Sequence, residues 1–355
     1  MVWRLLAVAF YASLFASSWN LWGAQEAFAG DSSACPNIRL DQGNGPVAPI
    51  PTYDQEDKNI CYAIVASELV DAYRFSSPDA NRKQLTSYLV TASHFSGMYR
   101  ETLNKMPGVQ RTDGLELGTP YWAILALKAE GSCDQNQLFK DPATAGIDKN
   151  LSDLNRIIGR YRAFRETGLQ AADPSSVSCL NARGTEFSDN LALFQSDIEK
   201  IFSSQKFYRC VDDFLNEVCK PFKIPLTDLP APKYVTFVNS KTDRNQALAA
   251  VIKDAFEQPK PQPIGIDYCR EVTQNQDDMG ADLTAEMSCT QHSSLIVGSK
   301  PGYDGSCILL VRDTSGPQCD PKVVWPCDRQ SPGEYWIPMA KLAHRSLAAT
   351  YFKHN

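Results

Sequence analysis

Apolar positions are spaced as in helices over the first part of this chain and gather into short strand-like runs over its last part. Residues 61–74 carry apolar side chains at helical spacing, with no glycine or proline between them, and predict a largely apolar helix. Residues 81–95 predict a second helix, and residues 96–112 predict a loop. Thr119 and Pro120 predict the N-cap and first residue of a third helix, which ends at Gly131.

Residues 134–231 differ in their sequence pattern from the stretches on either side. Amphipathic stripes over 151–164, 191–202 and 214–218 predict three further helices, whose apolar faces indicate a core. Cys179, Cys210 and Cys219 are spread through this stretch. The pattern therefore predicts a helical insertion held by disulfides.

Strand-like runs dominate from residue 232 onward. Residues 234–238 and 263–268 predict strands on either side of a helix over 243–257. Two apolar runs, 292–297 and 307–311, are joined by the turn-like residues 300–305 and predict an antiparallel hairpin, and 334–337 predicts a last strand. Helices first and strands later predict an α+β fold with two lobes. The helical lobe would span 30–133, the insertion 134–231 and the β-rich lobe 232–355.

Residues 1–29 have the pattern of a secretory signal peptide. Arg4 precedes an apolar core over 5–16, and Ala27-Phe28-Ala29 forms a small-x-small cleavage site. This core is too short to span a bilayer, so we expect an exported chain, extracellular or periplasmic, with no membrane anchor after cleavage. The net charge is −6 and no basic cluster stands out, which argues against nucleic acid as a partner.

Cysteine usage supports export and singles out one residue. All 11 cysteines follow the predicted cleavage site, and an oxidising compartment would pair them. An odd number leaves at least one free, and Cys61 at a helix start is the natural candidate. No Cys-x-x-Cys pair or Cys/His ligand spacing appears, so no metal or other cofactor is expected.

Four polar side chains form a candidate catalytic set. At the first turn of a helix, unpaired N–H groups and the helix dipole favour Cys61 as a thiolate. Gln55 lies on the preceding loop, where its amide would donate a hydrogen bond to an oxyanion beside the sulfur. His292 begins one strand of the predicted hairpin and Asp313 follows the other, so Asp313 is expected to orient the ring. Taken singly, Cys61 and His292 fit structural roles better; together with the other two they indicate nucleophilic catalysis.

These residues stand in motifs that resemble those of the papain-like cysteine peptidases. The nucleophile motif is matched by Gln55, five further residues and Cys61-Tyr62-Ala63-Ile64, and the histidine strand by His292-Ser293-Ser294-Leu295-Ile296-Val297-Gly298-Ser299. Similar stretches are Arg312-Asp313-Thr314-Ser315-Gly316, Gly333-Glu334-Tyr335-Trp336-Ile337, and, upstream of His292, the helix 245–257 with the strand 262–266. The resemblance covers residues 50–133 and 234–340, in family order.

The resemblance implies a papain-like two-lobe fold, with the Cys61 helix central to a helical lobe and an antiparallel β lobe beside it. It implies hydrolysis of peptide or protein substrates, with Cys61 as nucleophile and His292 as its ion-pair partner and later general acid. Gln55 and the Cys61 N–H would form the oxyanion hole, and Asp313 would orient the histidine.

The chain also departs from the family pattern. Asp313 replaces an Asn, and Ser315 replaces a Trp that shields the His–Asn contact, so the His–Asp contact is expected to be more open to water and weaker. Gly114 and Tyr62 are the expected substrate-binding residues, although one glycine of the family's Gly-Gly pair is missing or shifted. No pro-domain fits over 30–60, so the insertion is expected to take over regulation or substrate selection.

Disulfide pairing is partly constrained by counting. With Cys61 free, five cysteines precede residue 230 and five follow it, so full oxidation forces at least one bridge across that point. Cys35 is the choice, because in papain-like folds the N-terminal arm crosses to the β lobe. Cys319 and Cys327 are expected to pair locally, and the insertion's cysteines to pair with one another or with Cys133.

Two other functions fit the residues. A secreted pseudopeptidase that binds partners without chemistry would account for Asp313 and Ser315, although Gln55, Cys61 and His292 are intact. A transglutaminase-like acyltransferase also carries Cys, His and Asp in this order, usually with a shorter Cys–His gap and without the preceding Gln. Substrate preference and oligomeric state are not determined by the sequence.

Overall fold

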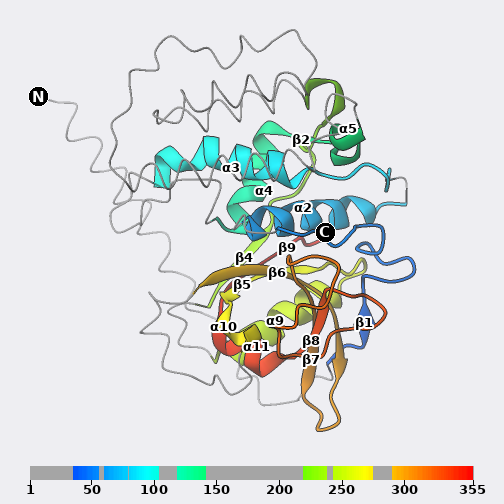
Figure 1. The fold of residues 1–355 in the computed structure, drawn as a ribbon, viewed down its shortest axis with the longest axis vertical. Coiled ribbons are helices and arrows are strands. Elements are labelled where there is room, and N and C mark those ends of the chain that lie inside the picture. Colours follow the sequence, from blue (N-terminus) through cyan, green and yellow to red (C-terminus); the bar gives the residue numbers. More distant parts are fainter. Residues whose placement is uncertain are drawn as a thin grey trace, which may run out of the picture. The chain divides into compact units, whose positions relative to one another are not determined.

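A computed structural model describes residues 35–55, 60–78, 80–103, 118–140, 219–237, 243–274 and 290–354. In these residues the chain is α+β, with helices packed on an antiparallel sheet (Figure 1), as predicted. None of the helices in these ranges is long and apolar enough to cross a membrane. The signal segment, Gly114 and the predicted insertion helices over 151–164, 191–202 and 214–218 lie outside the described residues, so those expectations stay predictions.

The main sheet holds seven strands in the order β4-β9-β5-β6-β7-β8, with β1 paired to β6. All of its neighbouring strands are antiparallel. The strands are β1 (Ile38–Arg39), β4 (Lys233–Thr236), β5 (Ile264–Cys269), β6 (Gln291–Pro301), β7 (Cys307–Arg312), β8 (Glu334–Pro338) and β9 (Ser346–Tyr351). The predicted hairpin is confirmed as β6 and β7.

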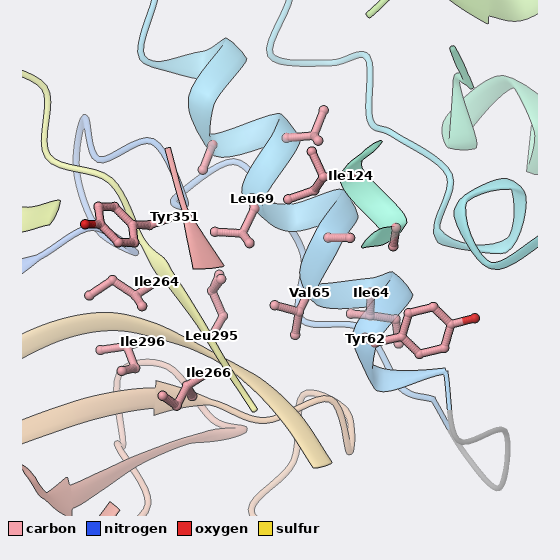
Figure 2. Close-up of a cluster of buried hydrophobic side chains, with 14 of the residues drawn as sticks. Tyr62, Ile64, Val65, Leu69, Ile124, Ile264, Ile266, Leu295, Ile296 and Tyr351 are labelled. Atoms are coloured by element: carbon pink, nitrogen blue, oxygen red, sulfur yellow. The ribbon is translucent and has the colours of Figure 1, made fainter. Parts of the chain in front are cut away.

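The helix α2 (Cys61–Phe75) is buried along almost its whole length. Helices α3 (Tyr88–Leu103) and α4 (Pro120–Glu130) pack on one side of it, and β5 and β6 on the other. Figure 2 shows Val65 and Leu69 on the sheet side of α2 and Ile124 of α4 on the opposite side. Burying one Val or Leu side chain contributes about 1.5–3 kcal/mol. Contacts with both layers therefore fix α2, and Cys61 with it.

Gly265 of β5 allows α2 to lie close to the sheet. A Cβ at this position would come within 2.8 Å of Val65 Cγ1 and 3.0 Å of Leu69 Cδ1. A larger residue would require the Val65 and Leu69 side chains, or the helix that carries them, to shift.

The remaining elements cover the edges of these layers. A small second sheet pairs β2 (Ser132–Cys133) with β3 (Lys223–Ile224). The predicted helix over 243–257 is present as α9 (Arg244–Phe256), where the Asp243 side chain caps the helix by accepting the Asn245 N–H at 2.9 Å. The other short helices are α5 (Gln135–Lys140), the 3₁₀ turn η2 (Lys220–Phe222), α10 (Glu271–Gln274) and α11 (Met339–Arg345).

The prediction for the second helix is wrong at both ends, since α3 begins at Tyr88 and runs to Leu103. Thr86 donates its N–H and its hydroxyl to the Asp71 carboxylate, at 2.9 and 2.6 Å. Ser87 N–H donates to the Cys133 carbonyl at 3.0 Å. These bonds to distant residues draw the predicted first turns out of the helix, and the predicted loop is helical as far as residue 103.

The strand over 334–337 is present as β8, but the prediction that it is the last strand is wrong. β9 follows it and lies between β4 and β5, where Thr350 is paired with both Tyr234 and Gly265. Residues 346–351 include few strong strand formers, so their pattern does not predict a strand. Pairing on both edges satisfies the backbone of β9.

Three disulfides join described residues: Cys35–Cys307, Cys133–Cys219 and Cys319–Cys327. The expectation that Cys35 crosses to the C-terminal half is confirmed, as is the local pair. The bridge accompanies β1, which adds the N-terminal arm to the sheet by pairing Ile38 with Ser299. Cys179 and Cys210 lie outside the described residues.

A buried charge cluster connects α2 to the end of β7. Arg312 Nε donates to Glu334 Oε1 at 2.8 Å, and Arg312 Nη1 lies 3.7 Å from Glu68 Oε1. Arg312 Nη1 also donates to the Ile50 carbonyl at 3.0 Å. Burial raises the pKa of Glu68 to about 8, although Arg312 opposes the shift. In the same way, burial raises the pKa of Glu334 to about 7.

The free energy of unfolding is expected to fall as the pH rises from about 5 to about 8. Burial raises the pKa of Asp71 to about 6 and that of Asp267 to about 7, in addition to the two glutamates. A carboxyl group whose pKa is higher in the folded chain binds its proton more tightly there. The stability that this group contributes is complete below its pKa in the unfolded chain. It is lost as the pH rises through its pKa in the folded chain. Urea unfolding at both pH values measures the difference.

Glu68→Gln is the matched variant for this prediction, because its side chain is uncharged at every pH. It should make the loss of stability between the two pH values smaller. A wild-type protein that is more stable at the higher pH would contradict the prediction.

Candidate active site

Cys61 is the first residue of α2. The N-cap residue, Ile60, makes no side-chain cap bond, so no capping side chain occupies the first turn. The Cys61 side chain is mostly buried, with 8% of the residue exposed. It is the free cysteine among the described residues, the others being in disulfides, and the expectation of a free Cys61 is confirmed.

The structure brings Cys61, His292 and Asp313 together. His292 Nε2 lies 2.6 Å from Asp313 Oδ1. The hairpin pairs Leu295 with Arg312, which places Asp313 just beyond the end of β7 and alongside the start of β6. The Cys61 side chain also lies close enough to His292 to raise the pKa of the ring. Because Nε2 faces Asp313, Nδ1 is the ring atom left for the sulfur.

The charges of this set reinforce one another. Burial alone would lower the pKa of His292, but the Asp313 carboxylate and the contact with Cys61 raise it to about 10. Burial alone would raise the pKa of Asp313, but the His292 charge and hydrogen bond, with further donors, lower it to about 2. At neutral pH Asp313 is therefore an acceptor, His292 Nε2–H is the donor, and the ring is held as imidazolium.

Asp313 is fixed by several donors besides the histidine. Thr314 N–H donates to Oδ1 at 2.7 Å, Ser315 hydroxyl to Oδ2 at 3.1 Å, and Ser294 hydroxyl to Oδ1 at 3.4 Å. The expectation that Ser315 leaves this contact open to water is wrong, because His292 is 2% exposed and Asp313 5% exposed. Ser315 adds a hydrogen bond to the carboxylate in place of a shield.

Gln55 lies on a segment fixed beside Asp313. Its N–H donates to the Thr314 carbonyl at 2.8 Å, and Gly316 N–H donates back to the Tyr53 carbonyl at 3.1 Å. The Gln55 residue is buried, and its Oε1 has no hydrogen-bond partner within the described ranges. The loop that carries Gln55 is thus tied to the strand end that positions the histidine.

Of the two expected substrate-binding residues, the structure describes Tyr62 but not Gly114. Tyr62 is 1% exposed, and its ring lies 5.0 Å from that of Phe95. A Cβ on Gly118 would meet the Tyr62 ring at 2.6 Å, so the ring packs tightly in the core beside Cys61. Gly114 lies outside the described residues and remains a predicted substrate contact.

Several residues around the histidine are not predicted from the sequence. The Tyr268 ring lies 5.6 Å from the His292 ring at an interplanar angle of 84°, and its hydroxyl lies 2.9 Å from Ser294 Oγ. Asp267 accepts a hydrogen bond from Ser293. The available signal was the presence of polar residues inside two otherwise apolar strands. No group of His, Cys, Asp and Glu within the described ranges could hold a metal ion.

Comparisons with known proteins give little further information. No model of a known protein family matches the chain, and no curated protein sequence matches it. The chain is similar to a solved structure described as PepW from Lactobacillus rhamnosis HN001, determined as the selenomethionine derivative. The TM-score is 0.47 and the identity 10%, over 88% of this chain and 81% of that one. Similarity at this level shows neither the fold family nor the function of this chain.

Proposed function

We propose that this chain is an exported, papain-like cysteine peptidase that hydrolyses peptide or protein substrates. The observation that carries the proposal is the contact of the free Cys61, at the start of a buried helix, with a His292 ring held from its other side by Asp313. A thiol, an adjacent base and a third group that orients the base are the arrangement of a nucleophilic catalyst. The motifs around these residues support the same function.

In the proposed acylation step, the Cys61 thiolate attacks the carbonyl carbon of the scissile peptide bond. The electron pair of the carbonyl moves to its oxygen, and the oxyanion receives hydrogen bonds from the Gln55 amide and the Cys61 N–H. When the tetrahedral intermediate collapses, the C–N bond breaks and His292 gives its proton to the leaving amine. The acyl group remains on the sulfur as a thioester.

In the proposed deacylation step, the now neutral His292 takes a proton from water, and the hydroxide attacks the thioester. Collapse releases the carboxylic acid and restores the Cys61 thiolate and the His292 imidazolium. Asp313 keeps the ring in one orientation in both steps, because its carboxylate accepts from Nε2–H throughout. Its charge favours the protonated ring needed for leaving-group departure.

Export is proposed from the predicted signal segment together with the disulfides. Disulfides such as Cys35–Cys307 form and persist in oxidising compartments. Among the described cysteines, Cys61 stays free of a disulfide, and it is the cysteine next to His292.

The proposal is tested by mapping the reactive cysteine. Iodoacetamide, and separately a peptidyl epoxide, are expected to modify Cys61 in the oxidised full-length protein and to stop peptide hydrolysis in step with modification. Mass spectrometry locates the adduct, and His292→Ala should slow modification by removing the partner of the thiolate.

The other outcomes decide between the alternatives. Modification of a different cysteine would overturn the assignment of Cys61. Modification of Cys61 in a protein that hydrolyses no peptide would favour a pseudopeptidase. An amide product formed from a glutamine-containing peptide and an added amine would favour an acyltransferase.

A further inference from the structure

Asp267 is a buried carboxylate that the proposed mechanism does not use. The residue is 2% exposed, and Ser293 is its hydrogen-bond partner among the described residues. No Lys or Arg of the described chain forms an ion pair with it. By contrast, the buried Asp71 pairs with Arg74 at 2.9 Å, and the buried Glu334 with Arg312 at 2.8 Å. A buried carboxylate without a cation is costly, and it is a group that a ligand can complete.

Strand geometry places Asp267 on the α2 side of the sheet, near the strand end that carries His292. Gly265 faces Val65, one helical turn after Cys61, and Asp267 lies two residues further along β5, so it is on the same face of the sheet. Asp267 is paired with Ser293, the residue after His292. The carboxylate therefore lies on the α2 side of the sheet, toward the end of the helix that carries Cys61.

The same face of the sheet continues to an aromatic side chain. Tyr234 of β4 is paired with Thr350 of β9, and Thr350 is paired with Gly265 of β5. Cross-strand partners share a face, so Tyr234 and Asp267 are on the same side of the sheet. Only small residues separate them on this face, since the β9 partner of Asp267 is Ala348.

Tyr234 belongs to a group of partly exposed aromatic rings, in which it stacks on Tyr121. It lies 4.7 Å from the ring of Tyr121, at an interplanar angle of 27°, and Tyr121 lies 5.2 Å from the ring of Trp122. Tyr234 and Trp122 are each 38% exposed. Burial raises the pKa of Tyr234, and the charge of Asp267 adds to the shift, which places the carboxylate within electrostatic reach of this ring.

We infer that Asp267 and the rings of Tyr121 and Tyr234 form a subsite that binds a basic side chain of the substrate, arginine in particular. This inference rests on the proposed function and names the substrate class of that site. The planar guanidinium stacks on aromatic faces and also donates to a carboxylate, so one side chain can use both features. Lysine offers the charge and the cation–π contact without the planar stacking.

The electrostatics of Asp267 agree with this assignment. Burial raises the pKa of Asp267 to about 7, against the Ser293 hydrogen bond and the positive charge of His292. A guanidinium brought next to the carboxylate would ionise it and gain a charge-assisted hydrogen bond. A neutral side chain would add no charge to that of His292 and would gain no charge-assisted hydrogen bond, which makes the subsite selective.

The experiment compares two peptides that differ in one group. One contains arginine and the other citrulline at the same position, which keeps the shape of the side chain and removes its charge. Scanning the pair through positions on both sides of the scissile bond locates the subsite. At one position kcat/KM should favour arginine by about 10- to 100-fold, the range expected of a hydrogen bond between charged groups.

Asp267→Asn should bring this arginine-to-citrulline ratio close to one. Tyr234→Leu, at an exposed position, should lower the ratio by about two- to fivefold through loss of the cation–π contact. Asp254→Asn is the matched control, since Asp254 pairs with Lys353 near the surface, and it should leave the ratio unchanged. A drop of both kcat/KM values by the same factor in Asp267→Asn would overturn the inference and assign Asp267 to support of His292.

Failure of this inference is distinguishable from failure of the proposed function. Hydrolysis without an arginine preference at any position would overturn the subsite and leave the peptidase intact. If no peptide is cleaved, calorimetry of the Cys61→Ala protein with the two peptides tests the subsite alone. Preferred binding of the arginine peptide, abolished by Asp267→Asn, supports the subsite there, and equal binding of both peptides would overturn it.

Discussion

Cys61→Ala is expected to abolish peptide hydrolysis, and His292→Ala to reduce it to a similar level. The sulfur is the atom that bonds to the substrate carbonyl, and His292 is the group that protonates the leaving amine, so neither step can be made by a neighbouring side chain. Losses on the order of 10⁶ in kcat are typical when a member of such a set is removed. Initial rates with a fluorogenic peptide, for folded proteins of equal disulfide content, measure the effect.

Substitutions of Gln55 and Asp313 are expected to lower the rate of hydrolysis by smaller factors than those of Cys61 and His292. Gln55→Ala should lower kcat by about 10²–10³, the usual effect of losing one oxyanion donor. Asp313→Ala should cost less than His292→Ala, because Asp313 orients the ring and takes no part in bond making. Asp313→Asn keeps an acceptor but removes the charge that raises the pKa of His292, so the alkaline limb of its pH–rate profile should move to lower pH.

Gln42→Ala is the control for this series, because the Gln42 amide donates to Gln330 away from the Cys61–His292 contact. Its rate should match that of the wild type. Undiminished hydrolysis by Cys61→Ala would show that the activity resides elsewhere, and the proposed mechanism would be wrong.

Arg312→Met is expected to destabilise the fold by about 3–5 kcal/mol at pH 8. Arg312 is 5% exposed and is the cation between Glu334, at 2.8 Å, and Glu68, at 3.7 Å. Removing it leaves Glu68 without its cation, leaves Glu334 with the longer Arg39 pair at 3.9 Å, and leaves the Ile50 carbonyl without its donor. Since those carboxyl groups have raised pKa values, they take up protons more readily at pH 5, where the loss should be smaller. Urea unfolding at both pH values measures the change.

Lys353→Met is the matched control for Arg312→Met. Lys353 pairs with Asp254 at 2.5 Å, but the two side chains are 44% and 36% exposed. A solvated pair of this kind contributes about 0–1 kcal/mol, so the control should change stability little despite its shorter distance. Equal losses of stability in the two variants would show that burial does not increase the contribution of the Arg312 cluster to the free energy of unfolding.

Much of the local structure follows from the sequence because its signals are local. The apolar spacing over 61–74, the Thr119-Pro120 start and the paired runs of the hairpin depend on neighbouring residues, and all three appear as predicted. Counting cysteines required a bridge between the halves of the chain, and Cys35–Cys307 supplies it. The candidate set of Cys61, His292 and Asp313 was visible by residue type and order.

The tertiary structure decided what depends on contacts between distant residues. Thr86 leaves a helix-compatible stretch because the Asp71 carboxylate accepts two of its hydrogen bonds, and β9 forms because β4 and β5 both pair with it. The closure of the His292–Asp313 contact to water was likewise set by packing. Asp267 is paired with Ser293, the residue after His292, because of the register between β5 and β6. Register depends on two strands together, so neither strand's sequence determines it alone.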